Sequence, residues 1–508
     1  MRNVITPQKT LGQIDIAKIE IDLKCRDEMP RILLGLQHIY CIPELKEQVF
    51  TVLKEIIPRE INPENGRPGM DLWKILVLGC IKLSCNWDYD KLHDIANNHK
   101  SLREMLGFGL MDEKKLFNRQ TIVDNISLFT PEVLDRINQI VVGAGLSLLR
   151  GKKNEELEIK GRCDSFVLET DVHFPTDINL LFDATRKVMT LISRVCSAAG
   201  QSGWRNSRSN IRKVKRLFRN SQTLKRSTSK DETKKTQREE MIKRAHHEYI
   251  KLAEFYLALS KDSISELQES GSITMGIAVQ ILEIELYMKH AYRQIDQIRR
   301  RVIRGETIPH EEKVFSIFEG HTEWISKGKA GVPQELGLKV CILEEQHGFI
   351  LHHRVMEKER DDEAAVAMVE EAKKKYPNLT RCSFDKGFHN PENQRKLREL
   401  LDFVILPRKG KLSPSDRLLE SSPDFLRGRR SHSAVESGIN GLENHGLDRC
   451  LDHGIVGFKR YVSFAILARN IEKLGCLIHS REVKNLKIKE KKKAIEVVRL
   501  DKQLRKTA

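Results

Sequence analysis

From residue 155 to residue 475 the sequence alternates short segments typical of strands with amphipathic helical segments. The strand segments are apolar and bounded by turn residues, and they cover 158–172, 336–343, 349–355, 380–385 and 402–406. The helical segments have apolar residues every three or four positions, and they cover 361–376, 391–401, 433–444 and 459–474. This alternation predicts an α/β layer architecture with a mixed sheet, because each helix must cover a face of the sheet.

Two long helical segments with heptad spacing interrupt this alternation. The first repeats apolar residues between Ile242 and Leu259, and the second between Ile281 and Val302. Matched apolar seams in consecutive helices predict an antiparallel helical hairpin, with dimerisation through either seam as the alternative. We therefore expect a helical insertion at 180–304. Without it, the order of the elements is also that of the ribonuclease H-like fold.

Residues 26–150 are predicted to be entirely helical. Short helices with Asn- and His-rich joints, followed by a polar entry into another helix, fit a helix-turn-helix-like DNA-binding domain. Arg119 and Gln120 begin that last helix, and both side-chain types can hydrogen-bond to base edges in a groove. The alternative is a helical domain that serves only for packing.

Positive charge is concentrated in two segments of the chain. The formal net charge is +17, and residues 204–245 contain 15 Lys/Arg against four Asp/Glu. Residues 481–508 contain 11 Lys/Arg against four Asp/Glu, so the rest of the chain is close to neutral. Lys and Arg bind the phosphate backbone through counterion release without reading sequence. One such segment is equally typical of a solvated helix face, but two together favour double-stranded DNA as the partner.

The cysteines and the apolar stretches of the sequence indicate the cellular compartment. The ten cysteines form no CxxC pair, which indicates reduced thiols rather than a disulfide framework. The first residues lack the apolar centre of a secretory signal. The most apolar stretch, residues 72–85, is too short to cross a bilayer and contains two lysines. We therefore expect no membrane partner and a cytoplasmic, nucleoid-associated protein.

Three acidic residues fall on separate elements of the predicted sheet and its covering helix. Asp164 lies in the first strand, Asp385 at the end of a second strand, and Glu436 in a helix. If the two strands are parallel neighbours, all three carboxylates can face one cleft. Carboxylate oxygens suit Mg²⁺, with Mn²⁺ as an alternative, and a pair of such ions supports in-line phosphodiester displacement. As metal ligands, these carboxylates need no shifted pKa.

Three sequence blocks resemble those of bacterial insertion-sequence DDE transposases, and most of all the ISNCY-type group. They are CDSFVLETDVHFPTDINLLFDATRKV (163–188), FDKGFHNPENQ (384–394) and AVESGINGLENHGLDRCLDHGIVGFKRYVSFAILARNI (434–471). The same group also shares stretches like those at 66–69 and 313–331. The blocks occur in the family's order over roughly residues 60 to 475, which makes their combination specific although each is weak alone.

The resemblance implies a ribonuclease H-like catalytic domain that depends on Mg²⁺ and binds terminal inverted repeats. It also implies a homo-oligomer, a dimer or larger, that holds two DNA ends. Position by position, it assigns the three metal ligands and catalytic acids to Asp164, Asp385 and Glu436.

The chain departs from the family's pattern at several positions. The first block reads DSF where the family has DST. Asp171 or Asp177 are therefore alternatives for the first acid, and Glu443 for the third. His432 stands where many relatives have an arginine one turn before the glutamate.

Several cations near these blocks are candidate DNA contacts, namely Lys327, Lys329, Lys386, Arg429 and Arg430. Zinc is the less favoured reading of His445, Cys450 and His453, because their spacing fits no usual site.

We expect four parts along the chain. They are an N-terminal tail (1–25), the helical DNA-binding domain (26–150), the catalytic domain with its helical insertion (155–480) and a basic C-terminal tail (481–508). The predicted function is Mg²⁺-dependent DNA cleavage and strand transfer between element ends and target. Two alternatives remain: an inactive DNA-binding descendant of such an enzyme, and a nuclease of the same fold that does not join strands.

Overall fold

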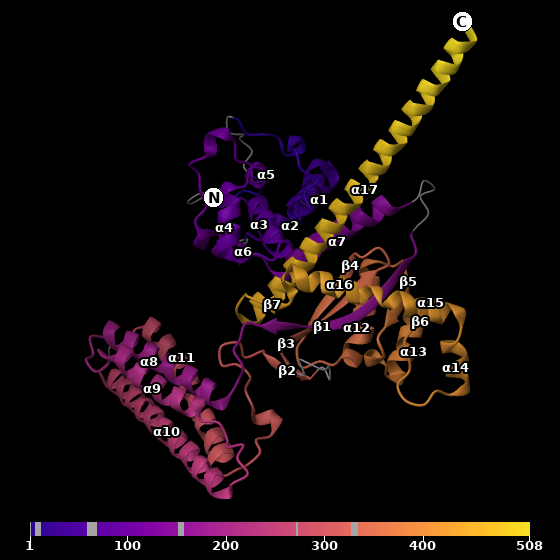
Figure 1. Ribbon diagram of the computed structural model, residues 1–508. Helices are drawn as coiled ribbons and strands as arrows, with labels where there is room; N and C mark the ends of the chain where they lie inside the picture. The colour runs from indigo at the N-terminus through magenta and orange to yellow at the C-terminus, as the bar shows by residue number, and fades with distance from the viewer. Residues whose placement is uncertain are drawn as a thin grey trace. The chain divides into compact units, whose positions relative to one another are not determined.

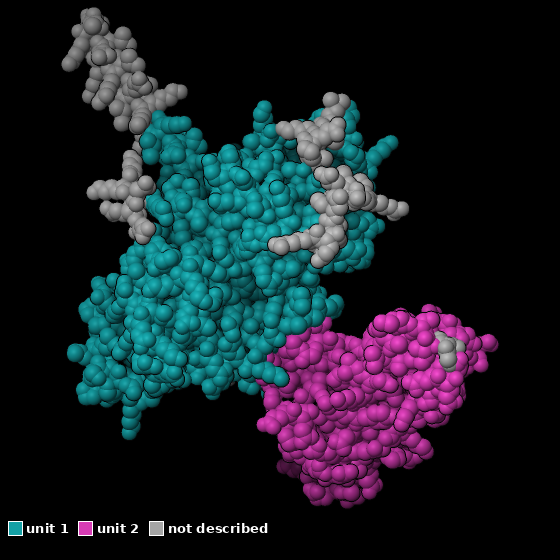
Figure 2. Space-filling view, turned by 180° about the vertical axis from the view of Figure 1, so that it is seen from behind, with its two compact units in different colours: residues 1–171, 325–508 teal, residues 172–324 magenta. Residues whose placement is uncertain are grey.

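The computed structural model describes residues 2–5, 12–57, 69–150, 157–270, 273–326 and 334–507. The chain forms two compact units (Figure 2). The first comprises residues 1–171 and 325–508, and the second comprises residues 172–324. The predicted insertion at 180–304 therefore lies within the second unit, and the two units are considered separately below.

A mixed seven-stranded sheet is the centre of the first unit (Figure 1). Its strands are β1 (Ile159–Thr170), β2 (Glu323–Ser326), β3 (Gln334–Glu345), β4 (Ile350–Met356), β5 (Leu379–Phe384), β6 (Phe403–Ile405) and β7 (Arg449–Cys450). The order is β2-β3-β1-β5-β6, with β4 paired to β3 and β7 paired to β1. β3 is antiparallel to β1 and β4, whereas β5 is parallel to β1 and β6. The predicted α/β architecture with a mixed sheet is confirmed.

Six helices accompany the later strands of this sheet. They are α12 (Asp361–Lys375), α13 (Pro391–Leu400), α14 (Pro414–Glu420), α15 (Pro423–His432), α16 (Ala434–Leu442) and α17 (Gly454–Thr507). The sequence of α12 suits a helix that begins at Asp361, because its first turn is acidic and its last turn contains three lysines. Acids at the amino end and bases at the carboxyl end both complement the helix dipole. α17 is far longer than the predicted 459–474 and continues through the basic segment from 481.

Seven helices precede the sheet and share its apolar core. They are α1 (Met29–Cys41), α2 (Pro43–Lys54), α3 (Leu72–Ser84), α4 (Tyr89–Asn98), α5 (Lys100–Met105), α6 (Arg119–Ile126) and α7 (Pro131–Leu149). α1, α3 and α7 pack along α17, and α7 also contacts β4 (Figure 1). One continuous cluster of buried side chains therefore extends from these helices to the strands.

The crossing of α1 and α17 depends on one glycine in each helix. A methyl group on Gly475 would lie 2.0 Å from the carbonyl oxygen of Arg31, and one on Gly35 would lie 2.2 Å from that of Ile471. Glycine at both positions lets the two helix backbones touch, which fixes how α17 lies against the amino-terminal helices.

The second unit is a helical bundle. Its helices are α8 (Asp177–Ala198), α9 (Ser207–Thr223), α10 (Glu232–Glu269) and α11 (Met275–Ile298). The two heptad-spaced helices, α10 and α11, touch each other little; α11 packs chiefly on α8, and α10 on α8 and α9 (Figure 1). The predicted two-helix hairpin is therefore wrong. α8 carries a broad apolar face, with Leu181, Val188 and Ile192 fully buried, and it packs on α11 and, together with α9, on α10.

The cysteines and the apolar helices bear on two expectations from composition. None of the ten cysteines forms a disulfide. Within the described ranges, no helix combines the length and apolar character that a membrane span requires.

The close approach of α1 and α17 gives a stability prediction. Gly475→Ala places a methyl group against the α1 backbone, and we expect it to lower the free energy of unfolding by about 1–3 kcal/mol. Gly143→Ala in α7 is the matched control, because no atom lies within 4 Å of the added methyl group. There the better helix propensity of alanine should stabilise by up to about 1 kcal/mol. Urea unfolding measures both changes, and effects of the same sign would contradict the close packing of α1 on α17.

Candidate active site

The three predicted acids lie on neighbouring elements of the first unit. β1 and β5 are parallel, with Cys163 opposite Phe384, so Asp164 and Asp385 are the next residues along two adjacent strands. Glu436 is in the first turn of α16, a helix that packs on β1. Asp164 is half-buried, whereas Asp385 and Glu436 are exposed. The fold thus gathers three acids that are more than 270 positions apart at the extremes.

The pKa of Asp164 depends on its burial and on the charges of neighbouring acids. Burial, reinforced by the negative charges of Asp385, Asp361 and Glu436, raises the pKa of Asp164 from 3.8 to about 6. The backbone N–H of Ser165 donates a hydrogen bond to Asp164 Oδ1 at 2.8 Å, which opposes this rise. Within the described part of the chain, no side chain pairs with the carboxylates of Asp385 or Glu436. These two carboxylates therefore carry negative charge that no described side chain neutralises.

Asp361 is a fourth acid that the sequence analysis missed. It is the first residue of α12; Ser165 Oγ donates to its Oδ1 at 2.7 Å, and Lys339 Nζ lies 2.8 Å from its Oδ2. A methyl group on Gly387 would lie 3.6 Å from Asp361 Oδ2 and 3.8 Å from Asp385 Oδ2, so the two carboxylates flank this glycine. An acid at a helix start is common for reasons of capping alone. The sequence therefore held no signal that set Asp361 apart.

His432, four residues before Glu436, contributes a neutral polar group to the site. Its Nδ1 lies 3.0 Å from Ser383 Oγ on β5, and its Nε2 is buried without a hydrogen-bond partner among the described residues. Burial lowers the pKa of His432, while the charges of Asp385 and Glu436 oppose that change. An imidazole thus lies between β5 and α16, beside two of the predicted acids.

The three alternative acids lie in other surroundings. Asp171 is exposed, with its Oδ1 3.6 Å from a guanidinium nitrogen of Arg449. Glu443 lines a cavity of about 500 Å³ together with Asp448 and Arg449. Asp177 belongs to α8 of the second unit and forms an ion pair at 2.9 Å with Arg301. Asp164 and Glu436 therefore stay the first and third acids of the candidate site.

The candidate DNA contacts divide into two groups. Lys386, Arg429 and Arg430 are exposed near the acids, following Asp385 and preceding His432, and none forms an ion pair with a described residue. Arg119 and Gln120 begin α6, where Arg119 pairs with Asp90 at 2.5 Å and Gln120 donates to Asp124 at 2.8 Å. Their side chains are engaged within the domain. Lys327 and Lys329 lie outside the described residues.

Among the described residues, no group of three or more His, Cys, Asp or Glu side chains is arranged so that it encloses a metal ion, at the carboxylates or elsewhere. His445 is hydrogen-bonded to the carbonyl of Ser84, and Cys450 lies 3.5 Å from the carbonyl of Asp452. The donor chemistry of Asp164, Asp385 and Glu436 nevertheless fits a hard divalent cation, because the ligands are anionic oxygens whose repulsion such an ion relieves.

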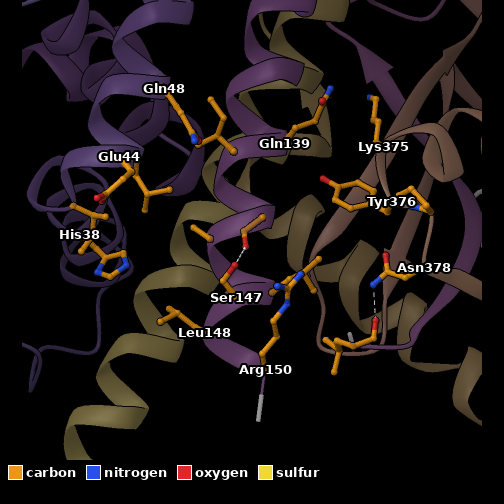
Figure 3. A pocket seen from close by; sticks show the side chains of 18 residues that line it. His38, Glu44, Gln48, Gln139, Ser147, Leu148, Arg150, Lys375, Tyr376 and Asn378 are labelled. Atoms are coloured by element: carbon orange, nitrogen blue, oxygen red, sulfur yellow. Dashed lines mark hydrogen bonds between the residues drawn. The ribbon is translucent and has the colours of Figure 1, made fainter. Parts of the chain in front are cut away.

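A second concave region of the first unit holds none of the predicted site residues. It is a cavity of about 840 Å³ between α1, α2 and α7 and the residues that follow α12 (Figure 3). Tyr376 faces it with a buried hydroxyl that lacks a described hydrogen-bond partner, and Lys375 beside it is paired with Asp135 at 2.6 Å. Among the described residues that line this cavity, Glu44 is the one acid. The carboxylates at the end of β5 are the better candidate for chemistry.

Comparison of the chain with models of protein families, with curated proteins and with solved structures found no match. Function is therefore inferred from the site and from the sequence blocks that carry its acids.

The raised pKa of Asp164 predicts a stability change that depends on pH. Because the folded pKa of about 6 exceeds the ordinary 3.8, the folded state binds the proton more tightly, and wild-type stability falls as pH rises through this window. Asp164→Asn removes that loss, and we expect it to stabilise the protein by about 3 kcal/mol at pH 7 to 8, with no gain below pH 4.

The control for this experiment is Asp171→Asn, because Asp171 is exposed and was the alternative first acid. We expect its effect to stay within about 0.5 kcal/mol at every pH. Thermal unfolding in metal-free buffer between pH 4 and pH 8 measures both variants. A loss of stability for Asp164→Asn at pH 8 would contradict the crowding of carboxylates around this residue.

Proposed function

We propose that this protein is a DNA transposase of the DDE type, which cuts and joins DNA by metal-dependent phosphoryl transfer. The observation that carries the proposal is the meeting of Asp164, Asp385 and Glu436 at one end of the sheet. Each of these acids comes from a different block of the sequence that resembles the transposase family. If the resemblance of these three blocks to the family were accidental, nothing would require the fold to bring their three acids together.

The strand order supports the finer assignment of the fold. Apart from the short strands β2 and β7, which pair with β3 and β1, the order is β4-β3-β1-β5-β6, with β4, β3 and β1 antiparallel to their neighbours among these three and with β5 and β6 parallel to β1. This is the strand order of the ribonuclease H-like fold that the resemblance implies. In that arrangement the first two acids are contributed by the two central strands, as Asp164 and Asp385 are here.

In the proposed reaction, Asp164, Asp385 and Glu436 hold Mg²⁺, for which Mn²⁺ can substitute. Bound ions would supply activation of the attacking oxygen and charge stabilisation at the leaving oxygen. The amide of Ser165 orients the Asp164 carboxylate, and the exposed cations Lys386 and Arg429 bind phosphates beside the cleavage point.

The proposed partner is double-stranded DNA, both the ends of a mobile element and its target. The formal charge of +17 supports a polyanionic partner. The family resemblance implies a complex that holds two DNA ends, so we propose a homo-oligomer that assembles on DNA in the bacterial cytoplasm.

Substitution of the second acid tests the proposed chemistry. The substrate is the DNA that flanks the reading frame, incubated with the full-length protein and Mg²⁺. We expect Asp385→Asn to lower strand joining by about 1000-fold or more, because losing a metal ligand removes several kcal/mol of transition-state stabilisation. DNA binding should remain, since the variant keeps every Lys and Arg.

Asp402→Asn is the matched control, because Asp402 is an exposed acid that precedes the parallel strand β6 and so lies at the opposite end of the sheet. It should join strands as the wild type does. Joined products that need Asp385 support a transposase, and nicks without joining indicate a nuclease instead. Wild-type binding without any cleavage would indicate an inactive DNA-binding protein, and full activity of Asp385→Asn would refute the acid assignment.

A further inference from the structure

α9 in the second unit differs in charge from every other helix of the bundle. Its 17 residues include six Lys/Arg and no Asp/Glu. Because successive residues of a helix are rotated by about 100°, five of these cations project within roughly a third of the circumference. This group, called the basic stripe below, consists of Arg208, Arg212, Lys215, Arg216 and Arg219.

The opposite face of α9 fixes the direction of the basic stripe. Val214 is fully buried, and Phe218 stacks on Phe182 of α8 with 4.9 Å between ring centroids. Near the carboxyl end, Ser221 Oγ donates a hydrogen bond of 3.2 Å to the carbonyl of Ala245 in α10. α9 is thus held on two neighbouring helices, and its cations are presented on a rigid surface.

The cations of the basic stripe are not neutralised by described acids of the protein. All five side chains are exposed, and none forms an ion pair with any residue that the structure describes. Elsewhere in the unit, half-buried cations form ion pairs with acids, as in Lys187–Glu283 at 3.1 Å and Arg299–Glu254 at 2.9 Å. Concentrated positive charge without a partner repels itself, so the basic stripe is better explained by binding to an external polyanion than by stabilisation of the bundle.

We propose that the basic stripe binds the phosphate backbone of duplex DNA without reading its sequence. From Arg208 to Arg219 the helix rises about 16 Å, a length over which a duplex presents several phosphates. The cations are suited to phosphates rather than to a choice among bases, so the contact positions DNA and does not select it. A membrane surface is disfavoured, because the apolar face that would insert is buried against α8.

This inference rests on the proposed function in one respect, that DNA is the substrate. It goes further by assigning a DNA-binding surface to the second unit, which holds none of the three proposed catalytic acids.

The salt dependence of binding tests the inference. The variant Arg212→Gln/Arg216→Gln/Arg219→Gln and the wild type are titrated with a random-sequence DNA duplex at a series of salt concentrations. Each lost phosphate contact lowers the slope of log K against log salt by about 0.9, so the slope should fall by about 3. At 0.1 M salt the affinity should be weaker by roughly 100-fold to 1000-fold.

The control variant removes the same charge from other exposed positions of the bundle, through Lys251→Gln/Lys261→Gln/Arg293→Gln on α10 and α11. It should keep the wild-type slope, and both variants should unfold at the wild-type temperature. An unchanged slope for the α9 variant overturns the inference. The inference is also overturned if the wild type binds single-stranded RNA more tightly than duplex DNA and the α9 substitutions weaken that binding, because the partner would then be RNA.

The outcome can be separated from that of the proposed chemistry. Asp385→Asn should show the wild-type salt slope whatever its activity. A lowered slope for the α9 variant in a protein that joins no strands would support this inference and contradict the transposase. An unchanged slope for the α9 variant in a protein that joins strands would contradict this inference and support the transposase.

Discussion

Parallel pairing of β1 with β5 forces two carboxylates into adjacent positions, and the rest of the first unit holds them there against their repulsion. α16 adds a third negative charge, and α12 adds a fourth through Asp361, which is restrained by Lys339 and Ser165. The apolar core shared by the amino-terminal helices, α17 and the strands stabilises the fold and offsets the repulsion between these carboxylates. Local destabilisation that persists within a well-packed fold is typical of a functional site.

Much of this organisation was readable from the sequence because it depends on local patterns. The strands around Asp164 and Asp385 were predicted within a few residues, since apolar segments bounded by turn residues are specified locally. Asp361 was not predictable, because its role arises from contacts with residues of β1 and β3 that are distant in sequence. The pairing of α10 and α11 was predicted wrongly for a related reason. A heptad seam shows that a helix has a partner and does not show which one. Here α11 packs on α8, and α10 packs on α8 and α9.

Charge is divided between the two units in a way that suits a polynucleotide substrate. The first unit gathers acids at the end of β5 with Lys386, Arg429 and Arg430 beside them, whereas the second unit presents the basic stripe of α9. Acids that repel a phosphate backbone need cations elsewhere to hold that backbone in place. The proposed division is therefore one of binding and chemistry, with sequence-independent phosphate contacts on the bundle and the reaction at the sheet.

The central claim is that the carboxylates at β1, β5 and α16 form a site for a divalent cation. Titration of the full-length protein with Mn²⁺, followed by the electron paramagnetic resonance signal of the free ion, tests it without any assumption about DNA. We predict saturable Mn²⁺ binding that Mg²⁺ displaces and that the double substitution Asp385→Asn/Glu436→Gln abolishes. Equal Mn²⁺ binding by the wild type and the double variant, or none by either, would contradict the account.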